Sequence, residues 1–147
     1  MPMQKALYPP NWAEISAEIR QRAGGCCEVC GLPNGTTICR NPDCLDEYLI
    51  FDLDLMGYLD MDGDPVRLSE LPGWYADSKE IAVVLTVGHR NHDPSDNRPE
   101  NLACWCQLHH LRHDAPHHAK NAARTRGRKR REAKVAQGQM ELELDLR

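Results

Sequence analysis

Two pairs of cysteine and histidine residues lie far apart in the sequence but have the same short spacing within each pair. Cys27 and Cys30 have two residues between them, and so do Cys106 and His109. Two such pairs can grip one zinc ion from opposite sides, because each turn offers two donor atoms toward the same metal. The spacing therefore predicts a structural zinc ion held by three cysteines and one histidine.

The other cysteines leave alternatives open. Cys104 could replace Cys106 as the third ligand, although Cys106 has the better spacing. Cys39 and Cys44 either bind a second metal or are free thiols, and we favour free thiols; Cys26 is expected to be a bystander. We expect metal binding rather than disulfides, because seven cysteines cannot all pair and the N-terminal residues lack the apolar stretch of a secretory signal. A soluble protein of a reducing compartment is the expectation.

A second polar set accompanies the cysteines. His89 follows an apolar run (LTVGHRNHD), Asn101 comes next along the chain, and His110 directly follows the last predicted zinc ligand. That order is hard to explain by core packing. It resembles the His-Asn-His constellation of the HNH endonuclease family, above all the short HNH proteins of bacteriophages. The resemblance covers roughly residues 12–121 and is strongest over residues 87–114.

The resemblance implies a metal-dependent endonuclease that hydrolyses DNA phosphodiester bonds, by nicking or by double-strand cleavage. His89 would be the general base, Asn101 would fix the loop that aims the imidazole, and His110 would bind a catalytic Mg²⁺ or another divalent cation. The pKa of a histidine side chain, about 6.5, suits a base at neutral pH. Phage genome processing, in the cytoplasm of a bacterium or of a phage-infected cell, is the expected setting.

The chain departs from the family at two positions. Many members have an Asp before the first His, where this chain has Gly88. We favour His92 and Asp114 as the replacement cation ligands; if His92 is the base instead, His89 becomes a ligand. His109 stands where the family usually has a fourth zinc cysteine, and zinc accepts imidazole nitrogen as readily. The alternative function is a catalytically inactive zinc-binding module that only binds DNA.

Local patterns predict the elements that position these side chains. Asn11 predicts the N-cap of a helix over residues 12–23, with Trp12, Ile15 and Ile19 on one face and Gly24-Gly25 at its end. Residues 81–87 are rich in β-branched side chains and predict one buried strand that presents His89 at its tip. A turn-rich loop, a second strand over residues 102–105 and a helix from about residue 107 complete the order strand, loop, strand, helix.

That order is the ββα-metal (His-Me finger) core that the resemblance implies. We therefore predict a small α+β domain over residues 1–118, with a flanking N-terminal helix and a structural zinc ion compensating for a core that contains only one Phe. Residues 43–80 hold eleven acidic and two basic side chains and suggest a hairpin or irregular insertion beside the site. No run reaches transmembrane length, so no membrane partner is expected.

Residues 119–147 form a basic tail with an acidic, leucine-rich end. A final helix is predicted to resume after Pro116 over residues 117–137. Its basic run suits double-stranded DNA, held through phosphates and without base reading. Residues Gln139 to Leu144 resemble peptides that dock on the bacterial DNA sliding clamp, and an assembly protein recruited through this end is a third functional class. The predicted DNA contacts are Lys120, Arg124, Arg126, Arg128, Lys129, Arg130 and Arg131.

Overall fold

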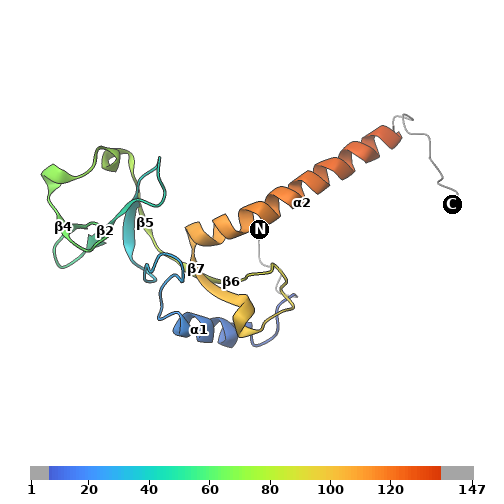
Figure 1. Ribbon diagram of the computed structural model, residues 1–147, viewed down its shortest axis with the longest axis horizontal. Coiled ribbons are helices and arrows are strands. Elements are labelled where there is room, and N and C mark those ends of the chain that lie inside the picture. The colour runs from blue at the N-terminus through green and yellow to red at the C-terminus, as the bar shows by residue number, and fades with distance from the viewer. Residues whose placement is uncertain (1–6, 137–147) are drawn as a thin grey trace. The chain divides into compact units, whose positions relative to one another are not determined.

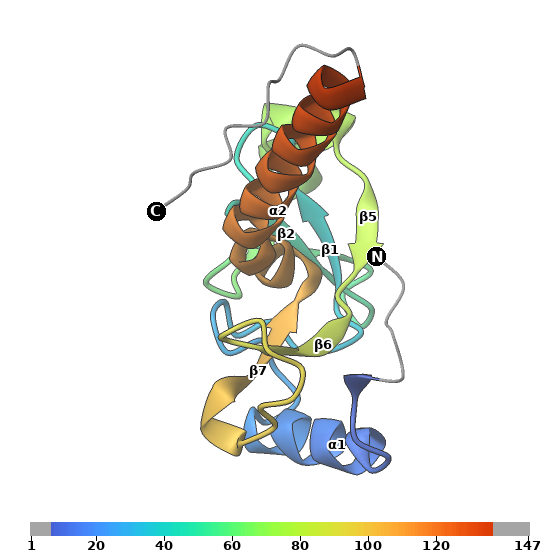
Figure 2. The ribbon, with the colours of Figure 1, turned by 90° about the vertical axis from the view of Figure 1, so that its right-hand side faces the viewer.

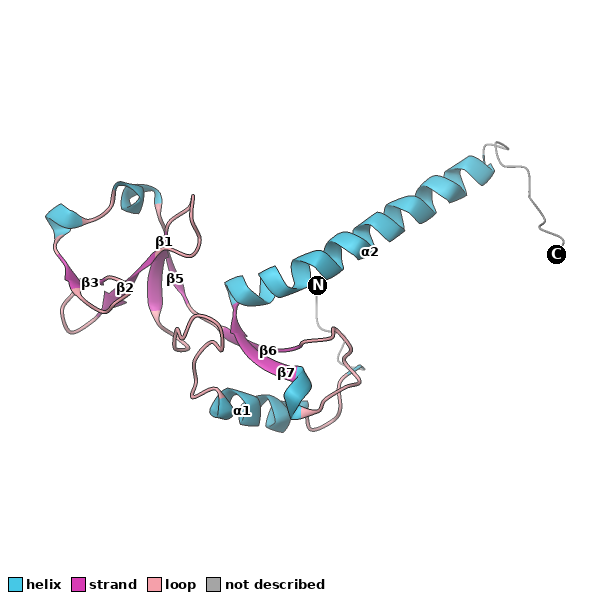
Figure 3. Ribbon diagram, in the orientation of Figure 1, coloured by secondary structure: helices cyan, strands magenta, loops and turns pink. Residues whose placement is uncertain are grey.

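The computed structural model describes residues 7–136 of the 147-residue chain (Figure 1). The chain divides into two compact units, a first unit of residues 1–110 and a second unit of residues 111–147. The first unit holds helix α1 (Trp12–Arg22), two antiparallel sheets and the first turn of helix α2 (Gln107–Ala136), and α2 continues through the second unit (Figure 3). The α+β class predicted from the sequence is confirmed. The predicted docking peptide at residues 139–144 lies outside the described residues.

The acidic middle of the chain is more regular than predicted. It contributes to a five-stranded antiparallel sheet in the order β4-β3-β2-β1-β5. Alternating apolar side chains bury one face of three neighbouring strands, as Cys39, Leu49 and Tyr58 show. The charged residues that suggested irregularity lie mainly on turns and on exposed strand positions. The strands are β1 (Thr37–Arg40), β2 (Tyr48–Asp52), β3 (Gly57–Leu59), β4 (Pro65–Val66) and β5 (Glu80–Ala82), with short 3-10 helices at Leu68–Glu70 and Gly73–Asp77.

The prediction of one strand over residues 81–87 was wrong, because the chain changes sheets within this run. Strand β5 ends at Ala82 and β6 (Leu85–His89) begins three residues later. Val83, between them, is 1% exposed, and its N–H donates to the Thr36 carbonyl oxygen at 2.8 Å. A β-branched run is compatible with either sheet, so its composition could not reveal the point of change.

Strand β6 pairs with β7 (Leu102–Cys106) in an antiparallel hairpin, and α2 begins at the next residue. The register runs from Leu85 opposite Cys106 to His89 opposite Leu102. Strand β7 is buried along its whole length. The predicted order of strand, loop, strand and helix is therefore present, with His89 as the last residue of its strand.

Helix α1 packs against both strands of this hairpin (Figure 2). The predicted apolar face is confirmed: Ile19 belongs to the buried core, and Trp12 and Ile15 pack against it. Asn11 is the N-cap residue, as predicted, but its side chain makes no capping hydrogen bond; its backbone carbonyl accepts from the N–H groups of Glu14 and Ile15. The paired glycines at 24 and 25 end the helix with positive φ angles, as predicted.

Helix α2 is one continuous helix through Pro116, so the prediction of a separate helix beginning after the proline was wrong. A proline inside a helix removes a single backbone hydrogen bond. In a helix of 30 residues, the hydrogen bonds on either side can hold the helix together despite that loss. Among residues 7–136, no helix combines the length and apolar character that crossing a membrane requires.

Candidate metal centre and histidine site

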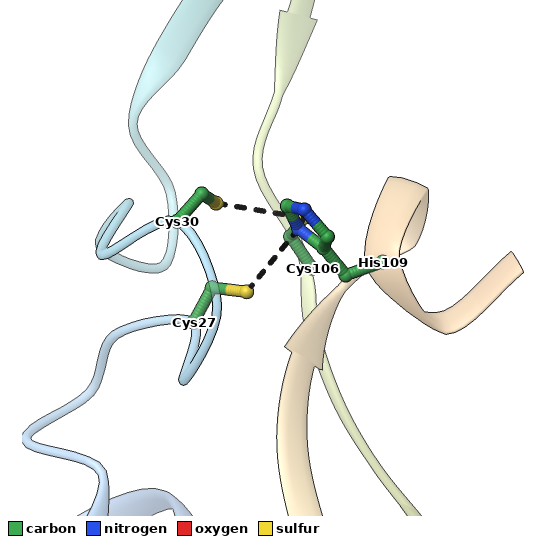
Figure 4. A group of neighbouring side chains, drawn as sticks. All are labelled: Cys27, Cys30, Cys106 and His109. Atoms are coloured by element: carbon green, nitrogen blue, oxygen red, sulfur yellow. Dashed lines mark hydrogen bonds between the residues drawn. The ribbon is translucent and has the colours of Figure 1, made fainter. Parts of the chain in front are cut away.

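Four side chains from three elements converge in the first unit, as Figure 4 shows. The Sγ atoms of Cys30 and Cys106 are 3.9 Å apart, and His109 Nδ1 lies 3.6 Å from Cys27 Sγ and 3.2 Å from Cys106 Sγ. In a tetrahedral zinc site with Zn–S bonds of about 2.3 Å and Zn–N bonds of about 2.0–2.1 Å, sulfurs are about 3.8 Å apart and sulfur–nitrogen pairs about 3.6 Å apart. The group therefore has the donor set and nearly the dimensions of a zinc site.

The local backbone explains how the four ligands meet. Cys27 and Cys30 lie on a tight turn in which the Gly31 N–H donates to the Cys27 carbonyl oxygen at 2.9 Å, and the φ angle of Gly31 is +74°. A positive φ at this turn favours glycine. The Glu28 N–H donates to the Cys104 carbonyl oxygen, which fixes the turn to β7. Cys106 ends β7 and His109 lies in the first turn of α2, so the hairpin and the turn together assemble the group.

The charges of the clustered sulfurs favour a cation among them. Burial acts to raise the pKa of Cys27, but hydrogen bonds from backbone N–H groups outweigh it and hold that pKa below the ordinary value. Burial and the neighbouring sulfurs of Cys27 and Cys106 raise the pKa of Cys30 to about 12. Several thiolates this close repel one another unless a positive charge lies between them. A divalent metal ion would supply that charge and allow the thiols to lose their protons.

The composition of the Cys/His group decides between cysteines whose roles the sequence did not settle. Cys106 belongs to it and Cys104 does not, although both are fully buried. Cys39 is buried in the other sheet, where its thiol lies 3.8 Å from the Tyr58 hydroxyl. Cys44 is exposed and Cys26 is half-buried, and neither joins a metal group among the described residues.

His89 is held on three sides at the end of β6. Its side chain is only 8% exposed, and its ring stacks on the Trp12 ring with centroids 5.3 Å apart and planes inclined by 16°. The Tyr8 ring lies against it at 5.8 Å. His89 Nε2 is 3.0 Å from Asn97 Oδ1. The ring face that stacks on Trp12 and the Nε2 atom are therefore already in contact with protein, so a ligand could approach His89 only along the edge of the ring that carries Nδ1.

Asn101 closes the loop that connects the two strands of the hairpin. Its Nδ2 donates to Asn91 Oδ1 at 2.9 Å and to the Asp96 carbonyl oxygen at 2.8 Å, and its Oδ1 accepts from the Asn91 N–H at 3.2 Å. Asn101 is 9% exposed, so these hydrogen bonds are shielded from water. They hold the loop shape but do not touch His89, which is contacted by Asn97 instead.

His110 lies beside the residue that precedes His89. Its Nδ1 is 2.6 Å from Thr86 Oγ1, and its ring contacts the Trp105 ring at 5.8 Å. Its Nε2 lies 3.0 Å from the position that a β-carbon would take at Gly88. Side chains alternate between the faces of a strand, so Thr86 and His110 are on one face of the hairpin while His89 is on the face that packs against α1.

The other predicted residues fall in both units. His92, in the loop after β6, is half-buried and has a φ angle of +59°, unusual for a residue other than glycine. Asp114 belongs to the second unit, where its carboxylate lies 3.9 Å from His118 Nε2. The seven predicted DNA contacts all lie on α2, and all are exposed.

Asn97 is a site residue that sequence reasoning missed. It lies in a loop of turn-forming residues, RNHDPSDNRPE, where asparagine is common for purely local reasons. Its eight-residue separation from His89 matches no helical or strand period, so only the folded loop shows the contact.

No protein-family model, curated protein or solved structure matches this chain.

Proposed function

We propose that this chain is a metal-dependent HNH-type endonuclease that hydrolyses DNA phosphodiester bonds. The observation that carries the proposal is the environment of His89. Its buried imidazole lies at the end of a strand, and one ring nitrogen contacts Asn97. Asn97 belongs to a loop that hydrogen bonds of Asn101 hold closed. Strand, loop, strand and helix follow in the order of a ββα-metal core, and the adjacent Cys/His group could hold a structural zinc ion.

In the proposed reaction His89 acts as a general base. A water molecule attacks phosphorus, its proton passes to the His89 imidazole, and the bond between phosphorus and the leaving oxygen breaks. The leaving oxygen takes a proton from solvent. The stacked and hydrogen-bonded ring would hold the base within hydrogen-bonding reach of the water. Such orientation removes much of the entropic barrier to the reaction.

A divalent cation, Mg²⁺ or another, would stabilise the negative charge on the phosphate. His110, whose Nδ1 contacts the Thr86 hydroxyl, is the proposed cation ligand of the first unit. Gly88 offers no carboxylate beside it, so His92 and Asp114 remain the proposed additional ligands. The cation requirement is therefore part of the proposal and is tested directly by varying the metal.

The proposed substrate is double-stranded DNA, and the basic residues of α2 are the proposed contacts. Exposed Lys and Arg side chains neutralise phosphates regardless of sequence, which suits a nuclease without base-reading groups. Phage genome processing, a cytoplasmic setting and a tether to the sliding clamp through residues 139–144 extend this proposal.

A plasmid-nicking assay tests the function. Supercoiled plasmid is incubated with the full chain in Mg²⁺, Mn²⁺ and other divalent ions, with and without chelator. We expect conversion to nicked or linear plasmid that the chelator abolishes, and losses of about 100-fold or more for His89→Ala and His110→Ala. His117→Ala, an exposed histidine of α2, is the matched control and should cleave normally.

The second candidate function is a zinc-binding module that binds DNA without cleaving it. Gly88 favours this alternative, since it lacks a ligand group and the His110 imidazole fills the space beside it. Plasmid binding without cleavage in every metal tested would support this module and reject the nuclease.

A further inference from the structure

We propose that Asn97 is a positioning residue that fixes the tautomer of His89. Its amide forces the hydrogen of the neutral imidazole onto Nε2 and leaves Nδ1 as the nitrogen that can accept a proton. The catalytic consequence rests on the proposed nuclease function, whereas the tautomer itself does not.

The orientation of the Asn97 amide is set by two backbone carbonyls. Its Nδ2 donates to the carbonyl oxygens of Pro94 at 3.2 Å and Ser95 at 3.3 Å. Carbonyl oxygens only accept hydrogen bonds, so the NH₂ group must face them. A flipped amide would lose both hydrogen bonds and bring oxygen against oxygen. The amide oxygen therefore faces His89.

The amide oxygen in turn determines which ring nitrogen carries the hydrogen. Asn97 Oδ1 is 3.0 Å from His89 Nε2 and can only accept. A neutral imidazole has one N–H donor and one acceptor nitrogen. Nε2 must therefore be the donor, and Nδ1 is left as the basic nitrogen.

The surrounding groups hold the His89 ring and the Asn97 amide in place relative to each other. Stacking on Trp12 fixes the plane of the imidazole, and burial limits exchange with water. On the other side, Asp96 is held by Arg98 through two hydrogen bonds of 2.8 and 2.9 Å, and its carbonyl accepts from Asn101. Asn97 lies between Asp96 and Arg98 in the sequence, so the hydrogen bonds that join those two residues restrict its backbone and leave its side chain little freedom to turn away.

The proton balance of the reaction follows from this tautomer. The attacking water gives one proton to Nδ1 of His89, and its oxygen forms the new bond to phosphorus as the bond to the leaving oxygen breaks. The resulting imidazolium keeps Nε2–H bonded to Asn97 Oδ1. The leaving oxygen is protonated by solvent, and the Nδ1 proton returns to solvent afterwards.

Nitrogen-15 NMR of the imidazoles tests the tautomer in the zinc-loaded full-length chain, with His89 assigned by its loss in His89→Gln. At a pH where the imidazole is neutral, we expect the wild type to carry the hydrogen on Nε2. Asn97→Ala should shift the ratio of the two tautomers toward Nδ1–H by roughly three- to tenfold, the loss of one hydrogen bond. Asn97→Asp, which keeps an acceptor oxygen, should retain the wild-type tautomer.

Asn91→Ala is the matched control, because Asn91 contacts Asp96 and Asn101 in the same loop but does not contact His89. It should leave the tautomer ratio unchanged. A wild-type His89 protonated on Nδ1, an unchanged ratio in Asn97→Ala, or an equal shift in Asn91→Ala would each overturn the inference.

Plasmid cleavage separates this inference from the proposed function. Asn97→Ala should cleave at least about tenfold more slowly than the wild type, and Asn97→Asp should recover most of that loss. A wild type with the expected tautomer but no cleavage in any metal would reject the nuclease while leaving the role of Asn97 in place. Full cleavage by Asn97→Ala would reject the positioning role.

Discussion

His110 Nε2 lies 3.0 Å from the position that a β-carbon would take at Gly88. The same β-carbon would be 3.1 Å from Cζ3 of the Trp105 ring. Gly88 is thus the point where the hairpin backbone approaches two rings closely. Members of the proposed HNH family often have an Asp at this position, and here the space for that side chain is filled by an imidazole.

Gly88→Ala should destabilise the first unit. The added methyl group meets the buried Trp105 ring and the His110 ring, which is hydrogen-bonded to Thr86 and cannot shift freely. Overpacking of this kind costs about 1–3 kcal/mol in the free energy of unfolding, measurable by urea denaturation. Gly73→Ala is the matched control: a β-carbon there meets nothing within 4 Å, and we expect a change within about 0.5 kcal/mol. Equal stabilities of the two variants would contradict the close approach at Gly88.

Replacing a zinc ligand should remove the metal. The purified chain should contain about one tightly bound zinc ion, and Cys27→Ser, Cys106→Ser or His109→Ala should each lower that content and the melting temperature, because metal binding and folding are coupled. Elemental analysis and thermal melts provide the measurements. A strong chelator should unfold the first unit of the wild type.

Cys44→Ser is the matched control for the metal site, because Cys44 is exposed and lies outside the group. It should keep both the zinc ion and the melting temperature. Full zinc content in Cys106→Ser, with loss in Cys104→Ser, would show that the third ligand has been assigned to the wrong cysteine.

The five-stranded sheet should lose stability in alkali through Tyr58. Burial, followed by the hydrogen bond that its hydroxyl donates to Glu80, raises the pKa of Tyr58 above the ordinary value of 10.0. Because the folded-state pKa is raised, the stabilisation is complete below about pH 10 and is lost as the pH rises above it. Tyr58→Phe should cost about 1 kcal/mol at neutral pH and should weaken the alkaline loss of stability.

Urea denaturation at neutral pH and above about pH 10 measures this dependence. Tyr8→Phe is the control, since Tyr8 lies outside this sheet, and it should retain the alkaline sensitivity of the wild type. Parallel pH profiles for the wild type and Tyr58→Phe would show that another group titrates.

The basic helix should set the salt dependence of DNA binding. Replacing Lys129, Arg130 and Arg131 with Gln removes three exposed charges from α2. If each contacts one phosphate, the slope of log K against log salt concentration should fall by about 2.7 for duplex DNA. Arg67→Gln, at an exposed arginine directly after β4 that pairs with Glu70, should leave the slope unchanged. A slope equal to that of the wild type would place DNA elsewhere on the protein.

Local spacing predicted much of the metal group. Cys27, Cys30, Cys106 and His109 were identified because a ligand pair separated by two residues is a local constraint, which the sequence records directly. The helix α1, its buried face and its glycine end were also predicted, for the same reason: periodicity and caps act over a few residues. Strand β7 and the start of α2 followed from similar patterns.

Contacts between distant segments required the tertiary structure. The division of residues 80–89 between two sheets depends on which partner strand each half meets, and composition does not encode that choice. The approach of His110 to Gly88 and the contact between His89 and Asn97 depend likewise on packing. A sequence fixes which side chains can do chemistry, whereas packing forces acting across the whole unit decide which of them meet.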